Sequence, residues 1–266
     1  MNLIELAEIR KTYRQGGLFG QRRSAEVLRG VNLRIEAGRC LGLLGSSGCG
    51  KSTTGRILLG LEAPDGGAVL YKGRDIAGLD AEAKRDFRRN CQVVFQNSHG
   101  AVNPRFPAWK IVAEPLVYFD RLPQSAQRDR AAHLLEQVGL AAADLDKLPH
   151  RFSGGELQRV CIARALAPKP AFVLLDEAVS ALDMANQSRV LDLLAELKRT
   201  TGTTFLFISH DLRVLLKICD ALAVMDGGRI TSQAADLNAL EASDILDDPA
   251  FRTLAQAVLP PEPVAV

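Results

Sequence analysis

Hydrophobic residues along the chain follow two different patterns, and each pattern predicts a different kind of strand. Val31, Leu33 and Ile35 alternate with polar side chains, which is typical of a strand with one buried face. Four other short runs are almost wholly apolar, as expected for strands of a parallel sheet that is covered on both faces. These runs are residues 40–44, 92–95, 172–175 and 204–208.

Two further segments extend the first pattern. Glycines flank the apolar run 68–71, and an Asp-Gly-Gly sequence at 226–228 follows the apolar run 222–225. Such a sequence after an apolar run favours a hairpin turn. We therefore expect residues 31–36, 68–71 and 222–225 to form an antiparallel β layer beside the parallel sheet.

Helical spacing of apolar residues predicts three helices. The first follows a glycine-rich loop, spans 51–59 and ends at Gly60. The second helix lies between the apolar runs 92–95 and 172–175, and the third helix lies between the runs 172–175 and 204–208. Their apolar positions are Ala131, Leu134, Leu135 and Val138, closed by Gly139, in the second helix, and Val190, Leu191, Leu194 and Leu197 in the third.

The order of these elements predicts the architecture. Apolar strands that alternate with helices indicate an α/β protein with a parallel core sheet. The stretch between the second and third runs indicates a helical subdomain inserted at about 97–165. We expect one cassette over residues 1–235, followed by a short extension at 236–266 that ends in a loose, proline-containing tail.

Composition narrows the class of protein without naming a function. The 266 residues are 47% hydrophobic and 24% charged, the balance of an ordinary soluble globular protein. The net charge of +2 is too weak to favour nucleic acid as a partner. The sequence contains neither a stretch of 18 uncharged apolar residues nor a signal-peptide core. Five scattered cysteines without a CxxC pair predict reduced thiols in a cytoplasmic protein.

The glycine-rich loop at 45–52 fits the pattern G-x4-G-K-[ST] at every fixed position, between a buried strand and a helix. Glycines let backbone N–H groups converge on phosphate oxygens, and the helix N-terminus adds partial positive charge. We expect Lys51 to contact the β- and γ-phosphates of a nucleoside triphosphate and Ser52 to bind Mg²⁺. The predicted phosphate-binding residues are Gly45, Ser46, Ser47, Gly48, Cys49, Gly50, Lys51, Ser52 and Thr53.

Cys49 lies inside this loop, near the start of the helix. A helix N-terminus lowers the pKa of a thiol. We therefore expect alkylation of Cys49 to inhibit ATP hydrolysis, and ATP to protect the thiol.

A second site is predicted where the apolar run 172–175 ends in Asp176 and Glu177. Two carboxylates at the end of a buried strand are costly unless a cation compensates them. Asp176 is therefore a candidate Mg²⁺ ligand, and Glu177 a candidate base for the attacking water. The alternative is a solvated acidic strand end, which the complete phosphate loop disfavours.

Several further motifs occur in the order found in the ATP-binding subunits of ABC transporters, and the chain resembles that family over roughly residues 3–230. Phe152-Ser-Gly-Gly-Glu-Leu-Gln-Arg159 resembles its signature segment and precedes a helical run, 160–167. Ser180-Ala-Leu-Asp183 resembles its D-loop. The resemblance implies a P-loop NTPase with the ABC ATPase fold: a RecA-like parallel core, an antiparallel β layer and a helical subdomain.

The resemblance also implies roles for single residues. Tyr13 matches the aromatic residue that stacks on adenine, Gln96 the glutamine that contacts Mg²⁺ and the membrane subunits, and His210 the histidine that senses the γ-phosphate. Two such cassettes meet head to tail in this family. Ser153, Gly154 and Gly155 therefore serve the nucleotide of the partner cassette.

Two positions depart from the family pattern. Glu156 stands where the signature usually has glutamine. Its carboxylate either adds like charge beside the partner's ATP or points into solvent. Ala178 also departs from the family's usual proline, but Glu177 before it is retained.

The resemblance extends to importers for oligopeptides, dipeptides and nickel. Residues 97–105 resemble the stretch that faces the permeases in that subfamily. Within that subfamily, the residue sequences at 101–105 and 175–180 and the short C-terminus resemble those of the nickel importers. The four histidines show no metal-ligand spacing. The implied partners are a second ATPase subunit, paralogous or identical, two transmembrane permeases and, indirectly, a solute-binding protein. This implies a peripheral location on the cytoplasmic face of the inner membrane.

Three alternatives stay open: a peptide importer subunit, a soluble ABC ATPase of translation or DNA repair, and an inactive cassette. Translation-type proteins usually hold two cassettes and repair-type proteins long coiled-coil heptads, neither of which this sequence contains. The presence of Lys51, Asp176, Glu177 and His210 disfavours an inactive cassette.

Overall fold

The computed structural model describes residues 1–15, 23–180 and 182–258, which form two compact units. The first unit consists of Met1–Leu79 and Leu206–Val266, and the second of Asp80–Phe205. The proline-containing tail predicted at 260–266 lies outside the described residues, whereas the extension before it includes α8 (Pro249–Val258). Among the described residues, every helix is too short or too polar to cross a membrane.

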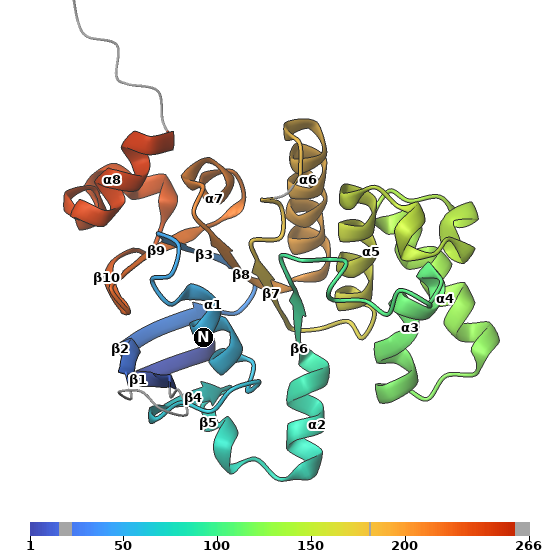
Figure 1. The fold of residues 1–266 in the computed structure, drawn as a ribbon, viewed down its shortest axis with the longest axis horizontal. Helices are drawn as coiled ribbons and strands as arrows, with labels where there is room; N and C mark the ends of the chain where they lie inside the picture. Colours follow the sequence, from blue (N-terminus) through green and yellow to red (C-terminus); the bar gives the residue numbers. More distant parts are fainter. Residues whose placement is uncertain (16–22, 181, 259–266) are drawn as a thin grey trace, which may run out of the picture. The chain divides into compact units, whose positions relative to one another are not determined.

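The first unit contains an antiparallel sheet with the strand order β2-β1-β4-β5 (Figure 1). Its strands are β1 (Asn2–Gln15), β2 (Arg23–Glu36), β4 (Gly66–Tyr71) and β5 (Arg74–Asp75). The alternating residues Val31, Leu33 and Ile35 are at most 1% exposed and face apolar residues of β1 across the pair. This confirms the predicted half-buried strand.

The pattern analysis did not predict β1. Ile4 and Leu6 keep the period of two, but the register shifts between Leu6 and Ile9, and Glu8 between them adopts a positive φ of 53°. A β-bulge of this kind moves the following side chains to the other face. Simple alternation is therefore lost along this strand.

The second sheet of the first unit is mixed. Strand β3 (Cys40–Gly45) lies between β9 (Ala221–Asp226) and β8 (Thr204–Ser209), and β10 (Arg229–Ala234) pairs antiparallel with β9. The predicted hairpin is confirmed, but its place in the antiparallel layer was wrong, because β9 pairs in parallel with β3. Residues 222–225 are fully buried, which suits a strand covered on both faces.

Helices of the first unit are α1 (Lys51–Leu58), α7 (Leu212–Ile218) and α8, with short 3₁₀ turns at Ile76–Gly78, Leu237–Ala242 and Asp244–Asp247. The helix predicted at 51–59 is thus confirmed to within one residue. Gly60 follows its C-cap with a φ of 65°, the left-handed conformation that ends many helices.

In the second unit, β6 (Cys91–Val94) and β7 (Phe172–Asp176) pair in parallel, as predicted for apolar runs. The helices are α2 (Ala81–Asn90), α3 (Ala108–Phe119), α4 (Gln124–Gln137), α5 (Gly154–Leu166) and α6 (Met184–Thr201). Short 3₁₀ turns occur at Ala142–Asp146 and Pro149–Arg151. Helices α3, α4 and α5 pack against one another (Figure 1). The insertion predicted at 97–165 lies within this unit.

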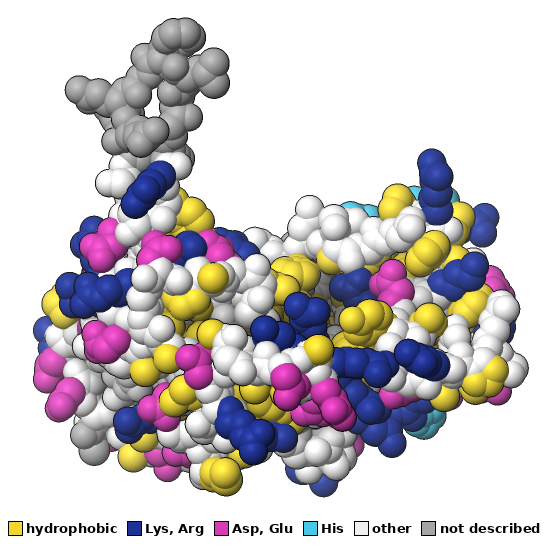
Figure 2. Space-filling view, turned by 90° about the horizontal axis from the view of Figure 1, so that it is seen from below, with side chains coloured by type: hydrophobic (Ala, Val, Ile, Leu, Met, Phe, Trp, Pro, Cys, Tyr) yellow, Lys and Arg dark blue, Asp and Glu magenta, His cyan; other side chains and the backbone are white. Residues whose placement is uncertain are grey.

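The apolar residues that predicted α4 and α6 are buried in the structure. Helix α5, by contrast, begins at Gly154, six residues before the predicted run 160–167, so the signature glycines belong to the helix. On the face drawn in Figure 2, acidic and basic side chains are interspersed, in agreement with the low net charge.

Candidate nucleotide-binding and signature elements

The phosphate loop connects the end of β3 to the start of α1 in the first unit. A Cβ atom added to Gly45 would lie 2.5 Å from the Met225 carbonyl oxygen, and Gly50 has a φ of 114°. Only glycine fits both positions without strain. The local packing therefore requires glycine at these two positions of the motif.

Lys51 lies across this loop. Its side-chain nitrogen donates hydrogen bonds to the carbonyl oxygens of Gly45 at 2.6 Å and Ser46 at 2.8 Å, and the residue is only 7% exposed. A buried ammonium needs such acceptors. They hold its positive charge at the loop, where it can complement a phosphate.

Cys49 corrects one expectation from the sequence. Burial raises the pKa of its thiol above the ordinary value, and this effect outweighs the nearby charge of Lys51. The side chain is 7% exposed, and its sulfur would lie 2.7 Å from a Cβ at Gly45. The predicted lowering of the pKa was wrong because packing, and not the helix N-terminus, dominates at this position.

Two other predicted residues lie in the first unit. Tyr13 is half-buried on β1, and its hydroxyl donates to Glu62 Oε2 at 2.8 Å. His210 is exposed directly after β8, and Asp211 beside it accepts a hydrogen bond from the Arg213 N–H at the start of α7. The fold thus presents the imidazole at the carboxyl end of a buried strand, where ligands bind in α/β sheets.

The acid pair lies in the second unit at the end of β7. Phe172–Leu175 are buried, whereas Asp176 and Glu177 are half-exposed. Glu177 has a positive φ of 50°, which is uncommon for a residue other than glycine. Strained backbone of this kind concentrates at functional sites, where surrounding structure holds it. The conformation therefore singles out Glu177 among the carboxylates of this strand end.

Gln96 and the start of the D-loop come together in the same unit. Gln96 Nε2 donates to Ser180 Oγ at 3.5 Å, and Ser180 Oγ donates to the Glu177 carbonyl oxygen at 2.9 Å. Gln96, which is 84 residues away in sequence, is thereby connected through Ser180 to the backbone of Glu177 in the stretch that follows β7.

The signature segment forms the N-terminus of α5. Ser153 is the N-cap residue, and its Oγ accepts from the Glu156 N–H at 3.3 Å, while Glu156 Oε2 accepts from the Ser153 N–H at 2.8 Å. This reciprocal pair is a capping box. The hydrogen bond from the Ser153 N–H lowers the pKa of Glu156. The carboxylate is thus turned back on its own helix, which neither sequence-based alternative foresaw.

Sequence reasoning missed Gln158. This residue is 3% exposed, hydrogen bonds to Ser98 through its Oε1 and donates from Nε2 to the Phe95 carbonyl oxygen at 3.5 Å. The sequence places Gln158 in the signature segment, and the structure shows that it hydrogen bonds to the segment that follows β6. A glutamine on an otherwise apolar helix face was the signal available in the sequence.

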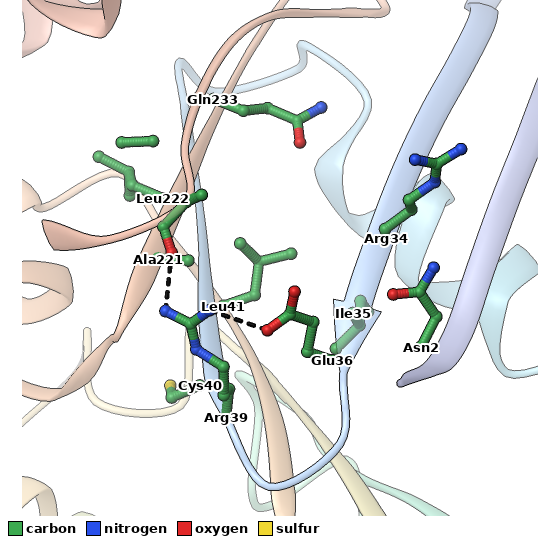
Figure 3. A pocket seen from close by; sticks show the side chains of 12 residues that line it. Asn2, Arg34, Ile35, Glu36, Arg39, Cys40, Leu41, Ala221, Leu222 and Gln233 are labelled. Atoms are coloured by element: carbon green, nitrogen blue, oxygen red, sulfur yellow. Dashed lines mark hydrogen bonds and ion pairs between the residues drawn. The ribbon is translucent and has the colours of Figure 1, made fainter. Parts of the chain in front are cut away.

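Figure 3 shows a cavity of about 290 Å³ in the first unit, and its lining residues include none of these motif residues. It is lined by the amino-terminal ends of β3 and β9, whereas the phosphate loop follows the carboxyl end of β3. Its Arg39 donates to Glu36 Oε2 at 2.8 Å and to the Ala235 carbonyl oxygen at 2.7 Å. The guanidinium of Arg39 therefore pairs with groups of this unit itself.

The glycine loop before a helix, the buried lysine and the acid-terminated strand define a P-loop nucleotide-binding protein. Residues 28–180 match the ABC transporter family. The chain is 45% identical to the nickel import ATP-binding protein NikE of Rhodospirillum rubrum, over 96% of this chain and 91% of the relative. It is 43% identical to the protein of the same name in Escherichia coli K12, over 99% and 97%.

Solved structures agree with this relationship. The dimeric, post-hydrolysis state of the ATP-binding cassette MJ0796 with ADP and Pi aligns with a TM-score of 0.78 and 29% identity, over 87% of this chain and 98% of that chain. CbiO1 from Clostridium perfringens, part of the ABC transporter complex cbiONQ, aligns with a TM-score of 0.77 and 26% identity, over 92% and 94%. The chain belongs to the ABC transporter family, which confirms the predicted ABC ATPase fold.

Proposed function

We propose that this chain is the ATP-hydrolysing subunit of an importer for nickel ion or a nickel chelate. The observation that carries the proposal is similarity at 43–45% identity, over nearly the whole length, to proteins named for nickel import. The complete set of ABC motifs on this fold supports an active ATPase rather than an inactive cassette.

The described residues fit a nucleotide with Mg²⁺. The glycine loop has positions at which a Cβ would collide with neighbouring atoms, and Lys51 supplies a positive charge there. Ser52, Gln96 and Asp176 offer the hard oxygen ligands that Mg²⁺ prefers. Bound Mg²⁺ would neutralise charge on the phosphates.

The chain's own residues divide the remaining work. In this proposal Tyr13 stacks on adenine, the phosphate loop holds the phosphates, Glu177 accepts a proton from the attacking water, and His210 contacts the γ-phosphate. Ser153, Gly154 and Gly155 contact the nucleotide of a second cassette. ATP that contacts both cassettes favours their closed arrangement, and loss of the γ-phosphate weakens it.

The proposed partners are a second ATPase subunit, paralogous or a second copy, and two transmembrane permeases. The segment at 97–105 is proposed to meet the permeases, because it resembles the permease-facing stretch of the importer subfamily. The protein would then lie on the cytoplasmic face of the inner membrane, and a solute-binding protein would deliver the cargo to the permeases.

Uptake measurements test the cargo. In a strain that lacks this protein, uptake of radioactive nickel should fall and uptake of a labelled dipeptide should be unchanged, and the wild-type chain but not Lys51→Ala should restore nickel uptake. Loss of dipeptide uptake alone would assign the peptide branch of the subfamily instead. Recovery of the protein only with ribosomes or DNA, and not with two permeases in solubilised membranes, would contradict an importer altogether.

A further inference from the structure

A cluster of charged side chains surrounds the hydroxyl group of Tyr13 in the first unit. The Tyr13 hydroxyl donates to Glu62 Oε2 at 2.8 Å. Arg56 donates from Nη2 to the Tyr13 oxygen at 3.3 Å and from Nε to Glu62 Oε2 at 3.2 Å. Three side chains thus form a closed set of hydrogen bonds at the far end of the tyrosine ring.

The cluster is itself held in place from β1. Lys11 Nζ lies 3.3 Å from Glu62 Oε1 and donates to the Ala63 carbonyl oxygen at 2.7 Å. The side chains of Lys11 and Glu62 are only 14% and 21% exposed, so water screens this pair less than a surface pair. Burial raises the pKa of Glu62, but hydrogen bonds from Tyr13, Arg56 and Lys11 outweigh it, and the carboxyl stays ionised at neutral pH.

The cluster also contacts α1, the helix that follows the phosphate loop. Arg56 Nη2 donates to Thr53 Oγ1 at 3.1 Å, and Thr53 is 7% exposed in the first turn of α1. Thr53 follows Lys51 and Ser52 directly in the sequence. One guanidinium therefore joins the tyrosine hydroxyl to the element that carries the phosphate-binding residues.

We propose that Glu62 and Arg56 are positioning residues that fix the Tyr13 ring before the nucleotide binds. The inference rests on the proposed stacking of Tyr13 on the adenine base. A ring anchored at its hydroxyl has already lost rotamer freedom, so less is lost when the flat base packs on it. The stacking surface is thereby held at a set place relative to α1.

Substitutions separate the ring from its anchor. Tyr13→Phe keeps the ring, and Glu62→Ala keeps the tyrosine, but each removes the hydroxyl bond to Glu62. Each should weaken ADP binding by the full-length protein roughly two- to tenfold, measured by calorimetry, the effect of one newly immobilised side chain. Tyr13→Ala should cost more, roughly five- to 150-fold, because base stacking is lost. For ATP hydrolysis, KM should rise while kcat at saturating ATP is retained.

Two controls distinguish positioning from general damage. Inorganic tripolyphosphate carries no base, so its binding should be the same in wild type, Tyr13→Phe and Glu62→Ala. Glu36→Ala removes another paired carboxylate of this unit, 2.8 Å from Arg39, and should leave ADP binding unchanged. For ADP, the double variant Tyr13→Phe/Glu62→Ala should bind less tightly than Glu62→Ala by less than the effect of Tyr13→Phe alone, since both substitutions remove the Tyr13–Glu62 hydrogen bond.

The outcomes separate this inference from the proposed function. Wild-type ADP affinity in Tyr13→Phe and Glu62→Ala, with weakened binding in Tyr13→Ala, would overturn the positioning role and leave stacking intact. Wild-type affinity in Tyr13→Ala would overturn the stacking role and the inference with it. Equal weakening of ADP and tripolyphosphate binding would also overturn it, by assigning the effect to the phosphate loop.

Discussion

Replacing Glu156 tests whether its carboxylate serves its own helix or faces a neighbouring nucleotide. In the structure, Glu156 Oε2 accepts the Ser153 N–H at 2.8 Å, and Ser153 Oγ accepts the Glu156 N–H at 3.3 Å. Glu156→Ala removes the first of these bonds and an acidic group from the first turn of α5. Glu156→Gln retains an acceptor, because glutamine also completes a capping box.

The structure sets the expected magnitude. Helix caps contribute about 0.5–2 kcal/mol, and Glu156 is half-exposed, so water replaces part of the lost bond and the cost should be about 1 kcal/mol. For a chain of this size that corresponds to a fall in Tm of about 2–4 °C. The exposed pair of Glu196 with Arg199, at 3.4 Å, supplies the matched control, and Glu196→Ala should change Tm far less.

The pH dependence follows from the direction of the pKa shift. The pKa of Glu156 is lower in the folded protein, so its stabilising contribution is present above the unfolded pKa and is lost as the pH falls through the folded value. The stability difference between wild type and Glu156→Ala, measured by denaturant unfolding, should therefore persist at neutral pH. The stability difference should shrink below a pH of about 4.3, which is the ordinary pKa of a glutamate side chain.

ATP hydrolysis supplies the refuting result. With the carboxylate bonded to the Ser153 N–H, Glu156→Gln should leave KM for ATP within about twofold of wild type, a difference of about 0.4 kcal/mol. A fall in KM of tenfold or more on Glu156→Gln would mean that the charge repels the nucleotide. Together with an unchanged Tm in Glu156→Ala, it would refute the capping role.

Three further outcomes are expected. Glu177→Gln should lower phosphate release about 10²- to 10⁴-fold and retain ATP-bound dimers in size-exclusion chromatography, whereas wild-type turnover would remove Glu177 from catalysis. Cys49 should react slowly with iodoacetamide near pH 7, because burial raises its pKa; mass spectrometry that finds it modified faster than in the unfolded chain would contradict this. Gln158→Leu should lower the free energy of unfolding by about 1–3 kcal/mol in urea titrations, since Ser98 loses a buried partner, and an unchanged midpoint would show that the bond contributes little.

Hydrophobic patterning predicted elements whose burial is set locally. Residues 190–197 and 131–138 are buried at the predicted positions because helical spacing turns them to one face whatever lies opposite. Strand β1 was missed because the bulge around Glu8 breaks the alternation, and the sheet of β9 was wrongly predicted because a hairpin turn does not reveal which neighbour the strand pairs with. Partner choice in a sheet depends on segments that are distant in the sequence, and pattern alone carries no such information.

The candidate site, like the fold, was predicted from the sequence only in part. Motif spacing identified the phosphate loop and the acid pair, because their chemistry needs particular residues at fixed intervals. Motif spacing misjudged the pKa of Cys49, because that pKa depends on burial. It gave no role to Glu62 or Gln158, because these side chains bond to residues 49 and 63 positions away in the sequence. The run predicted at 160–167 likewise began later than α5, which starts at Gly154, since two glycines are poor helix formers and the capping box at Ser153 and Glu156 is a side-chain geometry.

Helix α5 joins two surfaces that the proposed function needs to move together. Its N-terminus carries the residues proposed to contact the partner's nucleotide, and its buried face holds the segment proposed to meet the permeases. Gln158 bonds to Ser98 of that segment and to the Phe95 carbonyl oxygen just before it, and Arg164 Nη1 donates to the Ala101 carbonyl oxygen of the segment at 2.6 Å. Because these bonds are buried or partly buried, breaking them would leave polar groups unsatisfied at a cost of about 1–3 kcal/mol each. A displacement at one end of α5 therefore costs less when the attached segment moves with it than when it stays behind.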